Sequence, residues 1–195
     1  MENGGRDDEL LGRARRRDPA ALDELVAAFS PRVYGLLYRL TGSADVAQDL
    51  TQETFLRVVR TIDRYSHDGR FEAWIFRIAA NLARDQVRAR RRRGMTLSLD
   101  SEREDEESRS PVDPRDDAMP SARLAASEDA GLLEAALARL SEPEREILMM
   151  RHYGDLSFRE IADALNVPLG TALARAHRAL QRLKKWMSSS EEDSE

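Results

Sequence analysis

Apolar side chains recur at helical spacing through most of the chain, most clearly between positions 71 and 93. The apolar stripe of this segment consists of Phe71, Trp74, Ile75, Ile78, Ala79 and Leu82. Polar and basic side chains recur on another face, and positions 90–93 are all arginine. At about 3.6 residues per turn, this pattern predicts a long amphipathic helix with a basic outer face. The arginine cluster suits phosphate binding, although a solvated helix end followed by a basic linker also fits the spacing.

The segments before this helix predict three shorter helices. The pair Asp18-Pro19 suits an N-cap and a first helical position, and the pair Ser30-Pro31 predicts a second helix start of the same kind. Because Gly42 suits a helix end, two short antiparallel helices are expected up to this residue. A further helix is expected from about 44 to 62.

The polar residues of this last helix fall on one face, at spacings of three and four. They are Asp45, Gln48, Asp49, Gln52 and Glu53. An acidic and amide-rich stripe of this kind is a candidate binding surface, and a solvated face is the other interpretation. The following loop, from 64 to 70, contains an Asp-Gly pair and small polar residues. Loops beside rigid helices often carry specificity, although an ordinary connection between helices fits the composition too.

The second half of the chain predicts another set of helices. Leucines and alanines at 132–140 indicate one helix, and capping-box signatures at 141–144 and 157–160 open two more. Pro168 restarts the chain after a turn of three or four residues. Two helices joined so tightly predict a helix-turn-helix, whose second helix would enter a DNA major groove. The polar candidates for contacts there are Thr171, Arg175, His177 and Arg178.

Charge separates the folded segments from their connections. The net charge is −5, but acidic residues outnumber arginines nine to three from 100 to 117, and four of the last five residues are acidic. With its prolines and serines, the segment 94–127 therefore predicts a flexible acidic linker between basic domains. The chain has no cysteine and only scattered histidines, so neither a metal site nor a cofactor is expected. No apolar run is long enough to span a membrane, and a cytoplasmic protein without membrane insertion is expected.

Three segments resemble extracytoplasmic-function (ECF) sigma factors of the sigma-70 family, which are bacterial transcription initiation factors. FEAWIFRIAANLARDQVRARRRR, at 71–93, is similar to their promoter-melting and downstream-element region. ADVAQDLTQETFLRV, at 44–58, looks like their core-polymerase-binding region. LSEPEREILMMRHYGDLSFREIADALNVPLGT, at 140–171, resembles their upstream-element-reading domain. Together these segments and the resemblance predict an all-α protein of two helical domains, the second containing the helix-turn-helix.

The expected divisions of the chain follow from these patterns. They are an N-terminal extension at 1–17, a first domain at 18–93, the linker at 94–127, a second domain at 128–187 and an acidic tail at 188–195.

The resemblance implies three sets of binding residues. Asp45, Gln48, Asp49, Gln52 and Glu53 would contact core RNA polymerase. The loop would hold one base flipped out of the non-template strand, and the downstream-element contacts would be Tyr65, His67, Asp68, Arg77, Asn81, Arg84, Asp85 and Arg88. Thr171, Arg175, His177 and Arg178 would contact the upstream element. Trp74 is expected to pack in the core rather than act as a melting wedge.

One segment departs from the family pattern. Where family members commonly have valine, a basic residue, serine and leucine, this chain has Ala172, Leu173, Ala174 and Ala176. The loss of a cation and a hydroxyl puts the sequence and the affinity of the upstream element in doubt.

The expected function is that of a dissociable initiation subunit rather than an enzyme. It would bind core RNA polymerase, place its helix-turn-helix on the minus-thirty-five element and open promoter DNA at the minus-ten element. The resemblance also implies an anti-sigma protein as a partner. Two alternatives are a stand-alone helix-turn-helix regulator and an interaction module whose arginines bind an acidic partner or RNA.

Overall fold

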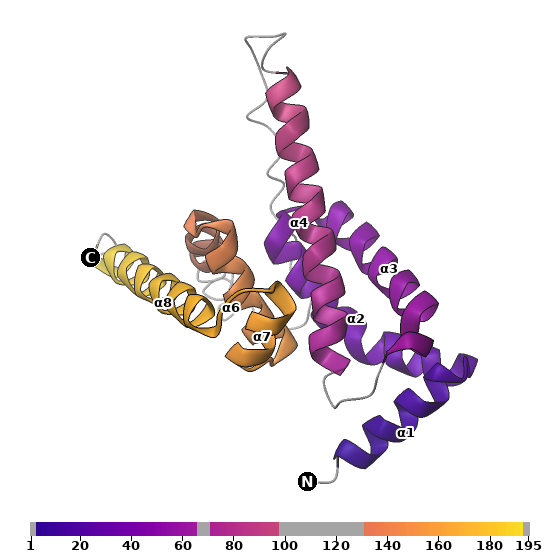
Figure 1. Ribbon diagram of the computed structural model, residues 1–195. Helices are drawn as coiled ribbons and strands as arrows, with labels where there is room; N and C mark the ends of the chain where they lie inside the picture. Colours follow the sequence, from indigo (N-terminus) through magenta and orange to yellow (C-terminus); the bar gives the residue numbers. More distant parts are fainter. Residues whose placement is uncertain (1–2, 66–70, 98–130, 193–195) are drawn as a thin grey trace, which may run out of the picture.

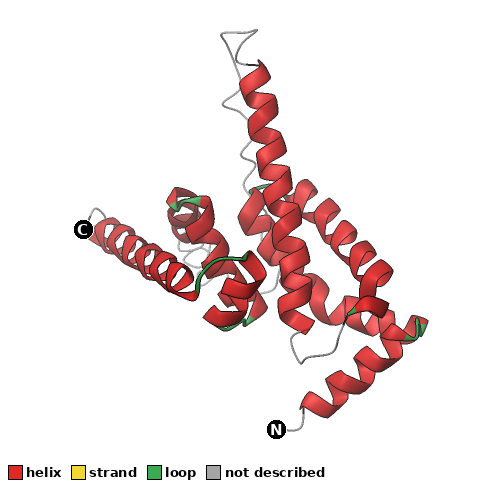
Figure 2. Cartoon of the chain, viewed as in Figure 1, coloured by secondary structure: helices red, strands yellow, loops and turns green. Residues whose placement is uncertain are grey.

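The computed structural model describes residues 3–65, 71–97 and 131–192, and the regular structure in these ranges is helical (Figures 1 and 2), as predicted. The first half contains α1 (Asn3–Arg15), α2 (Pro19–Thr41), α3 (Ala44–Thr61), the short 3-10 helix η1 (Ile62–Arg64) and α4 (Phe71–Leu97). The second half contains a helix at 131–139, α6 (Glu142–Gly154), α7 (Phe158–Leu165) and α8 (Leu169–Glu192). None of the helices in these ranges combines the length and apolar character that crossing a bilayer requires.

The helix α1 occupies the N-terminal extension, for which the sequence patterns predict no helix. It packs on α2 through Leu11 and Ala14, which are both buried. The spacing of three between these apolar residues is the signal that indicates a helix here. As predicted, Asp18 caps α2: its carboxylate accepts from the backbone N–H of Ala20 at 3.0 Å, and also from Nε of Arg13 at 2.8 Å.

A single helix, α2, spans the region where two short helices are predicted, so that prediction is wrong. Pro31 lies inside α2, although proline removes a backbone hydrogen bond and opposes helix continuation. The apolar stripe passes Pro31 without a break, since Leu25, Val33 and Leu36 are all buried. Burial of this face holds both halves in line. The helix ends where predicted, at Gly42, which has a φ of 69°.

The helices α2, α3 and α4 enclose the core of the first domain. Its largest fully buried side chains are Leu25, Val33, Leu36, Leu37, Val58, Ile62, Ile75 and Phe76. The helix α4 runs beyond Arg93 to Leu97, so the first residues of the expected linker are helical. The rest of the expected linker, at 98–127, lies outside the described residues.

The second domain contains the predicted helix-turn-helix. Capping boxes at 141–144 and 157–160 open α6 and α7, as predicted. Asn166, with a φ of 53°, ends α7, and α8 begins three residues later at Leu169. The helix α8 then continues to Glu192, into the segment expected to be an acidic tail.

The two domains pack directly against each other, which the sequence does not predict. The helix α6 contacts α2, and both α6 and α7 contact α4 (Figure 1). The ring of Tyr153 of α6 lies on Gly35 of α2, where an added Cβ atom would clash with it. One apolar core therefore continues from the first domain into the second. We refer to this packing as the closed arrangement.

Candidate nucleic-acid interface

The polar stripe of α3 lies on the surface, as predicted. Asp45, Gln48, Asp49 and Gln52 are exposed, and Glu53 is half-buried. Glu53 accepts a hydrogen bond of 2.7 Å from Nε of Arg57, one turn further along. The opposite face of α3 is buried, and there the hydroxyls of Thr51 and Thr54 donate to carbonyls four residues earlier. The stripe is therefore free of the core, and its contact with polymerase stays a prediction.

An apolar groove runs beside this stripe, between α2 and α3. It has a volume of about 440 Å³ and is lined by Val26, Ser30, Thr51, Gln52, Phe55, Leu56 and Val59. Leu56 is 51% exposed, and Gln52 belongs to both the groove and the stripe. The sequence patterns do not predict this groove, although Leu56 directly follows Phe55 in the chain. A polar edge and an apolar groove together make this surface suitable for protein binding.

A second hollow lies at the N-terminal end of α4. It has a volume of about 340 Å³ and is lined by Arg57, Thr61, Arg64, Tyr65, Trp74 and Ile78, a set we call the aromatic pocket. The rings of Tyr65 and Trp74 are 5.0 Å apart, and Tyr65 is 7% exposed. Trp74 also packs against the core, as predicted, but it lines the pocket as well. His67 and Asp68 lie outside the described residues.

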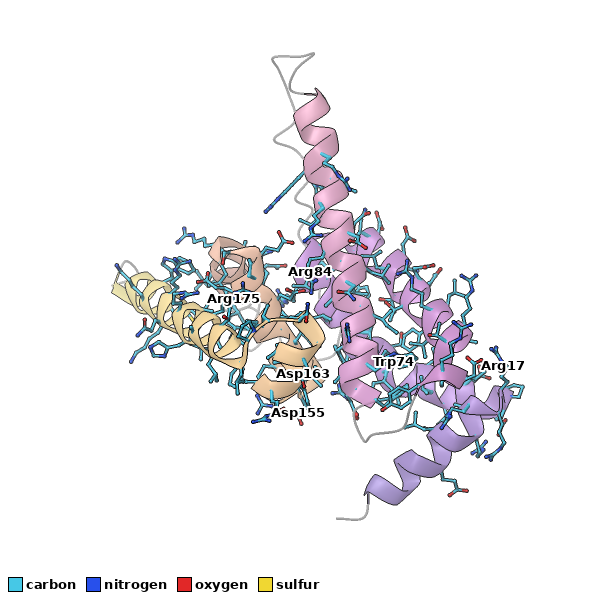
Figure 3. The ribbon with its side chains drawn as sticks, in the orientation of Figure 1. Arg17, Trp74, Arg84, Asp155, Asp163 and Arg175 are labelled. Atoms are coloured by element: carbon cyan, nitrogen blue, oxygen red, sulfur yellow. The ribbon has the colours of Figure 1, made fainter. Side chains whose placement is uncertain are left out.

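The basic face of α4 is not uniformly exposed. Arg77, Asp85 and Arg88 are exposed, whereas Asn81 and Arg84 are half-buried. Figure 3 shows Arg84 on the side of α4 that faces the second domain. Its Nε donates to Oε1 of Glu146 of α6 at 2.9 Å, and its Nη2 is buried without a hydrogen-bond partner among the described residues. In the closed arrangement α6 therefore covers much of Arg84, and its contact with the downstream element stays a prediction.

Other polar contacts join the two domains around this ion pair. Nε of Arg32 donates to the backbone carbonyl of Tyr153 at 2.7 Å. The hydroxyl of Tyr38 donates to Glu134 at 2.9 Å, and burial together with this carboxylate raises the pKa of Tyr38 to about 12. Burial raises the pKa of Glu146 despite the attraction of Arg84. Forming the Arg84–Glu146 pair therefore carries the free-energy cost of removing a carboxylate from water.

The helix α8 presents different side chains to the protein and to solvent. Ala172, Ala176 and Ala179 are buried against the domain. Among the predicted contacts, His177 and Arg178 are exposed, and Thr171 and Arg175 are half-buried.

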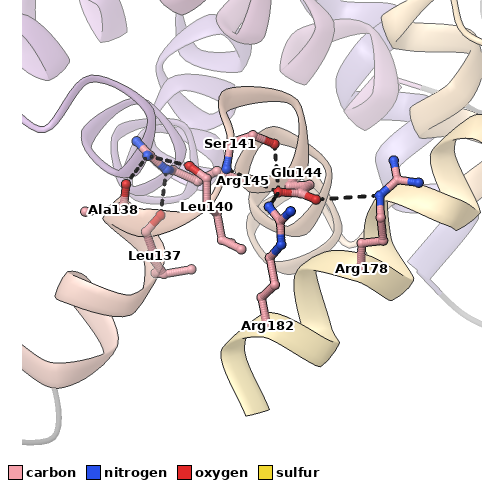
Figure 4. Close-up of polar contacts among 8 residues, drawn as sticks. All are labelled: Leu137, Ala138, Leu140, Ser141, Glu144, Arg145, Arg178 and Arg182. Carbon is pink, nitrogen blue, oxygen red and sulfur yellow. Dashed lines mark hydrogen bonds and ion pairs between the residues drawn. The ribbon is translucent and has the colours of Figure 1, made fainter. Parts of the chain in front are cut away.

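Glu144 of α6 contacts two arginines on one side of α8. Nε of Arg178 lies 3.7 Å from Glu144, and Nη1 of Arg182 donates to Glu144 at 2.8 Å (Figure 4). Ser141 also hydrogen-bonds this carboxylate, at 2.7 Å. Arg178 is thus available to DNA only alongside an acidic neighbour, whereas His177 bonds to Gln181 on the open face.

Comparison with known proteins identifies relatives of both domains. Two family profiles match: Sigma-70 region 2 over residues 25–93, and Sigma-70, region 4 over residues 130–183. The ECF RNA polymerase sigma factor SigE of Mycolicibacterium smegmatis is 40% identical over 88% of this chain, which spans 64% of that relative's length. The RNA polymerase sigma factor CarQ of Myxococcus xanthus is 36% identical, over 91% of this chain and 96% of its own.

A solved structure has the same fold. It is the sigma factor RpoE in complex with the anti-sigma factor NepR from Bartonella quintana, with a TM-score of 0.69 and 22% identity over 85% of this chain and 96% of that one. The two profiles fall in order on the two helical domains, and the CarQ match extends across both. The chain therefore belongs to the ECF sigma factors of the sigma-70 family, which are DNA-binding transcription initiation factors.

Proposed function

We propose that this sigma factor binds core RNA polymerase through α3, recognises a two-element promoter and holds the melted downstream element against its first domain. The observation that carries this proposal is the aromatic pocket. Trp74 offers its ring to a flipped base and packs against the buried Tyr65, whose ring lies 5.0 Å away, while Arg57 and Arg64 lie beside them for a phosphate or a base edge. The pocket volume of about 340 Å³ is at the low end of ligand sites, which suits a single base.

The protein would open promoter DNA by binding the single-stranded form more tightly than the duplex. Flipping a base costs a few kcal/mol, and stacking on an aromatic side chain returns about 1–3 kcal/mol per base. A pocket that accepts only an unstacked base stabilises single-stranded over duplex DNA without any covalent step. Asn81, whose amide both donates and accepts, and Arg77 and Arg88 continue this surface along α4.

The surface of α3 supports the polymerase contact. Its carboxylates and amides suit a basic partner surface, and the adjacent groove beside Leu56 suits an apolar side chain of the same partner. A stand-alone helix-turn-helix regulator would leave both features without a role. The protein would act in the cytoplasm, where promoter DNA and polymerase meet, and the NepR complex of its structural relative supports an anti-sigma protein as a further partner.

The closed arrangement bears on promoter binding. Arg84 cannot reach DNA while α6 covers it, so downstream-element recognition through Arg84 requires the second domain to leave α4. Core polymerase would separate the two domains by binding them at different places on its surface.

In vitro transcription with purified core polymerase and a promoter library tests the proposal. Transcripts that depend on this protein and share two spaced upstream motifs are expected. The absence of such transcripts, with core polymerase active on a control sigma factor, would refute the proposal.

Charge reversal tests the assignment of α3. The variant Asp49→Lys/Glu53→Lys should lose core binding in a pull-down or by fluorescence anisotropy. The matched control is Asp23→Lys/Glu24→Lys, which makes the same change of charge at exposed positions of α2. Equal losses in both variants would indicate a general charge effect and contradict the assignment.

A further inference from the structure

One flank of α8, next to its buried alanine face, carries exposed apolar side chains. Leu169, Leu173, Leu180 and Met187 are 37%, 45%, 55% and 48% exposed. Offsets of 4, 11 and 18 residues from Leu169 correspond to about one, three and five turns, so the four side chains form one stripe. We call it the leucine stripe. It borders the buried alanine face of α8, and each of its four side chains is more than a third exposed.

Leu173 has the position from which a recognition helix contacts bases. It lies in the second turn of α8, and recognition helices read base edges with their N-terminal residues. Its exposed neighbour Ala174 adds a second small apolar group, and His177 lies one turn further along. Leu180 and Met187 are about 10 and 20 Å further along the axis at 1.5 Å per residue. Only the N-terminal part of the stripe can therefore lie within a major groove, which is about 12 Å wide.

The chemistry of Leu173 selects among bases. Guanine is commonly read by a bidentate cation, which neither Leu173 nor Ala174 provides. Of the two nearby arginines, Arg175 is half-buried, and Arg178 shares the carboxylate of Glu144. Thymine alone presents a methyl group in the major groove, and an apolar side chain is its natural contact.

We propose that Leu173 reads the C5-methyl group of thymine in the upstream element and so favours an A·T pair at the position facing the second turn of α8. This inference rests on the proposed function, because it assigns the specificity of its upstream contact.

Replacing thymine by deoxyuridine tests the inference, since only the methyl group is removed. Promoters selected by transcription with core polymerase and the full chain would be rebuilt with deoxyuridine at one upstream thymine at a time, and holoenzyme affinity measured. At one or two positions the affinity should fall about fourfold, the effect expected for one buried methyl group. The variant Leu173→Ala should bind thymine and deoxyuridine promoters equally. The matched control Leu180→Ala, on the same stripe, should keep the wild-type difference.

The outcomes separate this inference from the proposed function. Promoter binding with equal thymine and deoxyuridine affinities at every position, or selected upstream elements without thymine, would overturn the role of Leu173 alone. A Leu173→Ala holoenzyme that keeps the wild-type preference for thymine over deoxyuridine would also overturn it. A wild-type protein that directs no promoter binding at all would overturn the proposed function and this inference with it.

Discussion

The ion pair between Arg84 and Glu146 gives a quantitative test of the closed arrangement. The change Arg84→Met keeps most of the aliphatic packing of the side chain but removes its charge. Glu146, whose side chain is 8% exposed, would then be buried without a counter-charge. Burial already raises its pKa with Arg84 in place, so the carboxylate depends on this partner.

The size of the effect follows from the geometry. Removing one partner of a fully buried pair typically costs about 3–5 kcal/mol. Arg84 keeps a quarter of its side chain exposed, and Glu146 can escape into solvent when α6 leaves α4. We therefore expect Arg84→Met to destabilise the closed arrangement by about 2–3 kcal/mol relative to the separated domains. This corresponds to a shift of roughly 30- to 150-fold in the population ratio.

The assay uses the absence of cysteine from the chain. The substitutions Arg60→Cys and Lys184→Cys, at exposed positions of α3 and α8, would carry two spin labels. Double electron–electron resonance should give one narrow distance distribution for the parent protein and an added broad component for Arg84→Met. The matched control Arg77→Met, at an exposed arginine of the same helix, should keep the narrow distribution.

A second substitution decides whether charge is the cause. Adding Glu146→Gln to Arg84→Met removes the orphaned carboxylate and should restore most of the closed population. If Arg84→Met left the distance distribution unchanged, or if the double variant opened further, the argument from an unpaired buried charge would be refuted.

Three further predictions use the same chain. Gly35→Ala places a Cβ against the ring of Tyr153 and should open the domains in the same spin-label assay, whereas Gly12→Ala, which meets only Arg16 at 3.8 Å, should not. Burial raises the pKa of Glu146, so the closed form binds a proton there more tightly than the open form does. The closed population should therefore grow as the pH falls towards the ordinary glutamate range. A Glu146→Gln variant with the same pH response would contradict this. Although burial opposes it, bonds from Ser141 and the charges of Arg182 and Arg178 lower the pKa of Glu144. The stabilisation of the fold by Glu144 is therefore present above the ordinary glutamate pKa and lost as the pH falls below it. At neutral pH, Glu144→Ala should lower the free energy of unfolding by about 1–2 kcal/mol and the thermal midpoint by about 2–8 °C. A full-length Glu144→Ala protein with an unchanged midpoint would speak against this role.

The local signals of the sequence predicted where several of the helices begin. Caps such as Asp18 and the segments 141–144 and 157–160 act through hydrogen bonds to nearby backbone groups, so their residues alone define them. Pro31 shows the limit of that reasoning. Its local effect favours a break, but the buried stripe on both sides of it holds one helix, and that burial depends on partners elsewhere in the chain.

The binding surfaces were predictable only as faces of single helices. The exposed stripe of α3 follows from periodicity within one helix. The covering of Arg84 does not, because Glu146 lies 62 residues away and nothing local links the two positions. The aromatic pocket likewise gathers side chains from α3, η1 and α4, including Tyr65 at the end of η1, so its composition emerges only when those segments pack.

The continuation of α4 to Leu97 changes how its arginines are presented. In a helix, successive side chains turn by about 100°. Arg88, Arg90, Arg91 and Arg92, all exposed, therefore point in different directions around the axis, like a collar rather than a row. A DNA strand laid along one side would meet only some of them. The salt dependence of DNA binding should accordingly report fewer phosphate contacts than the number of arginines suggests. The collar attracts polyanions from more than one side, but Arg91 pairs with Glu142 of α6 in the closed arrangement.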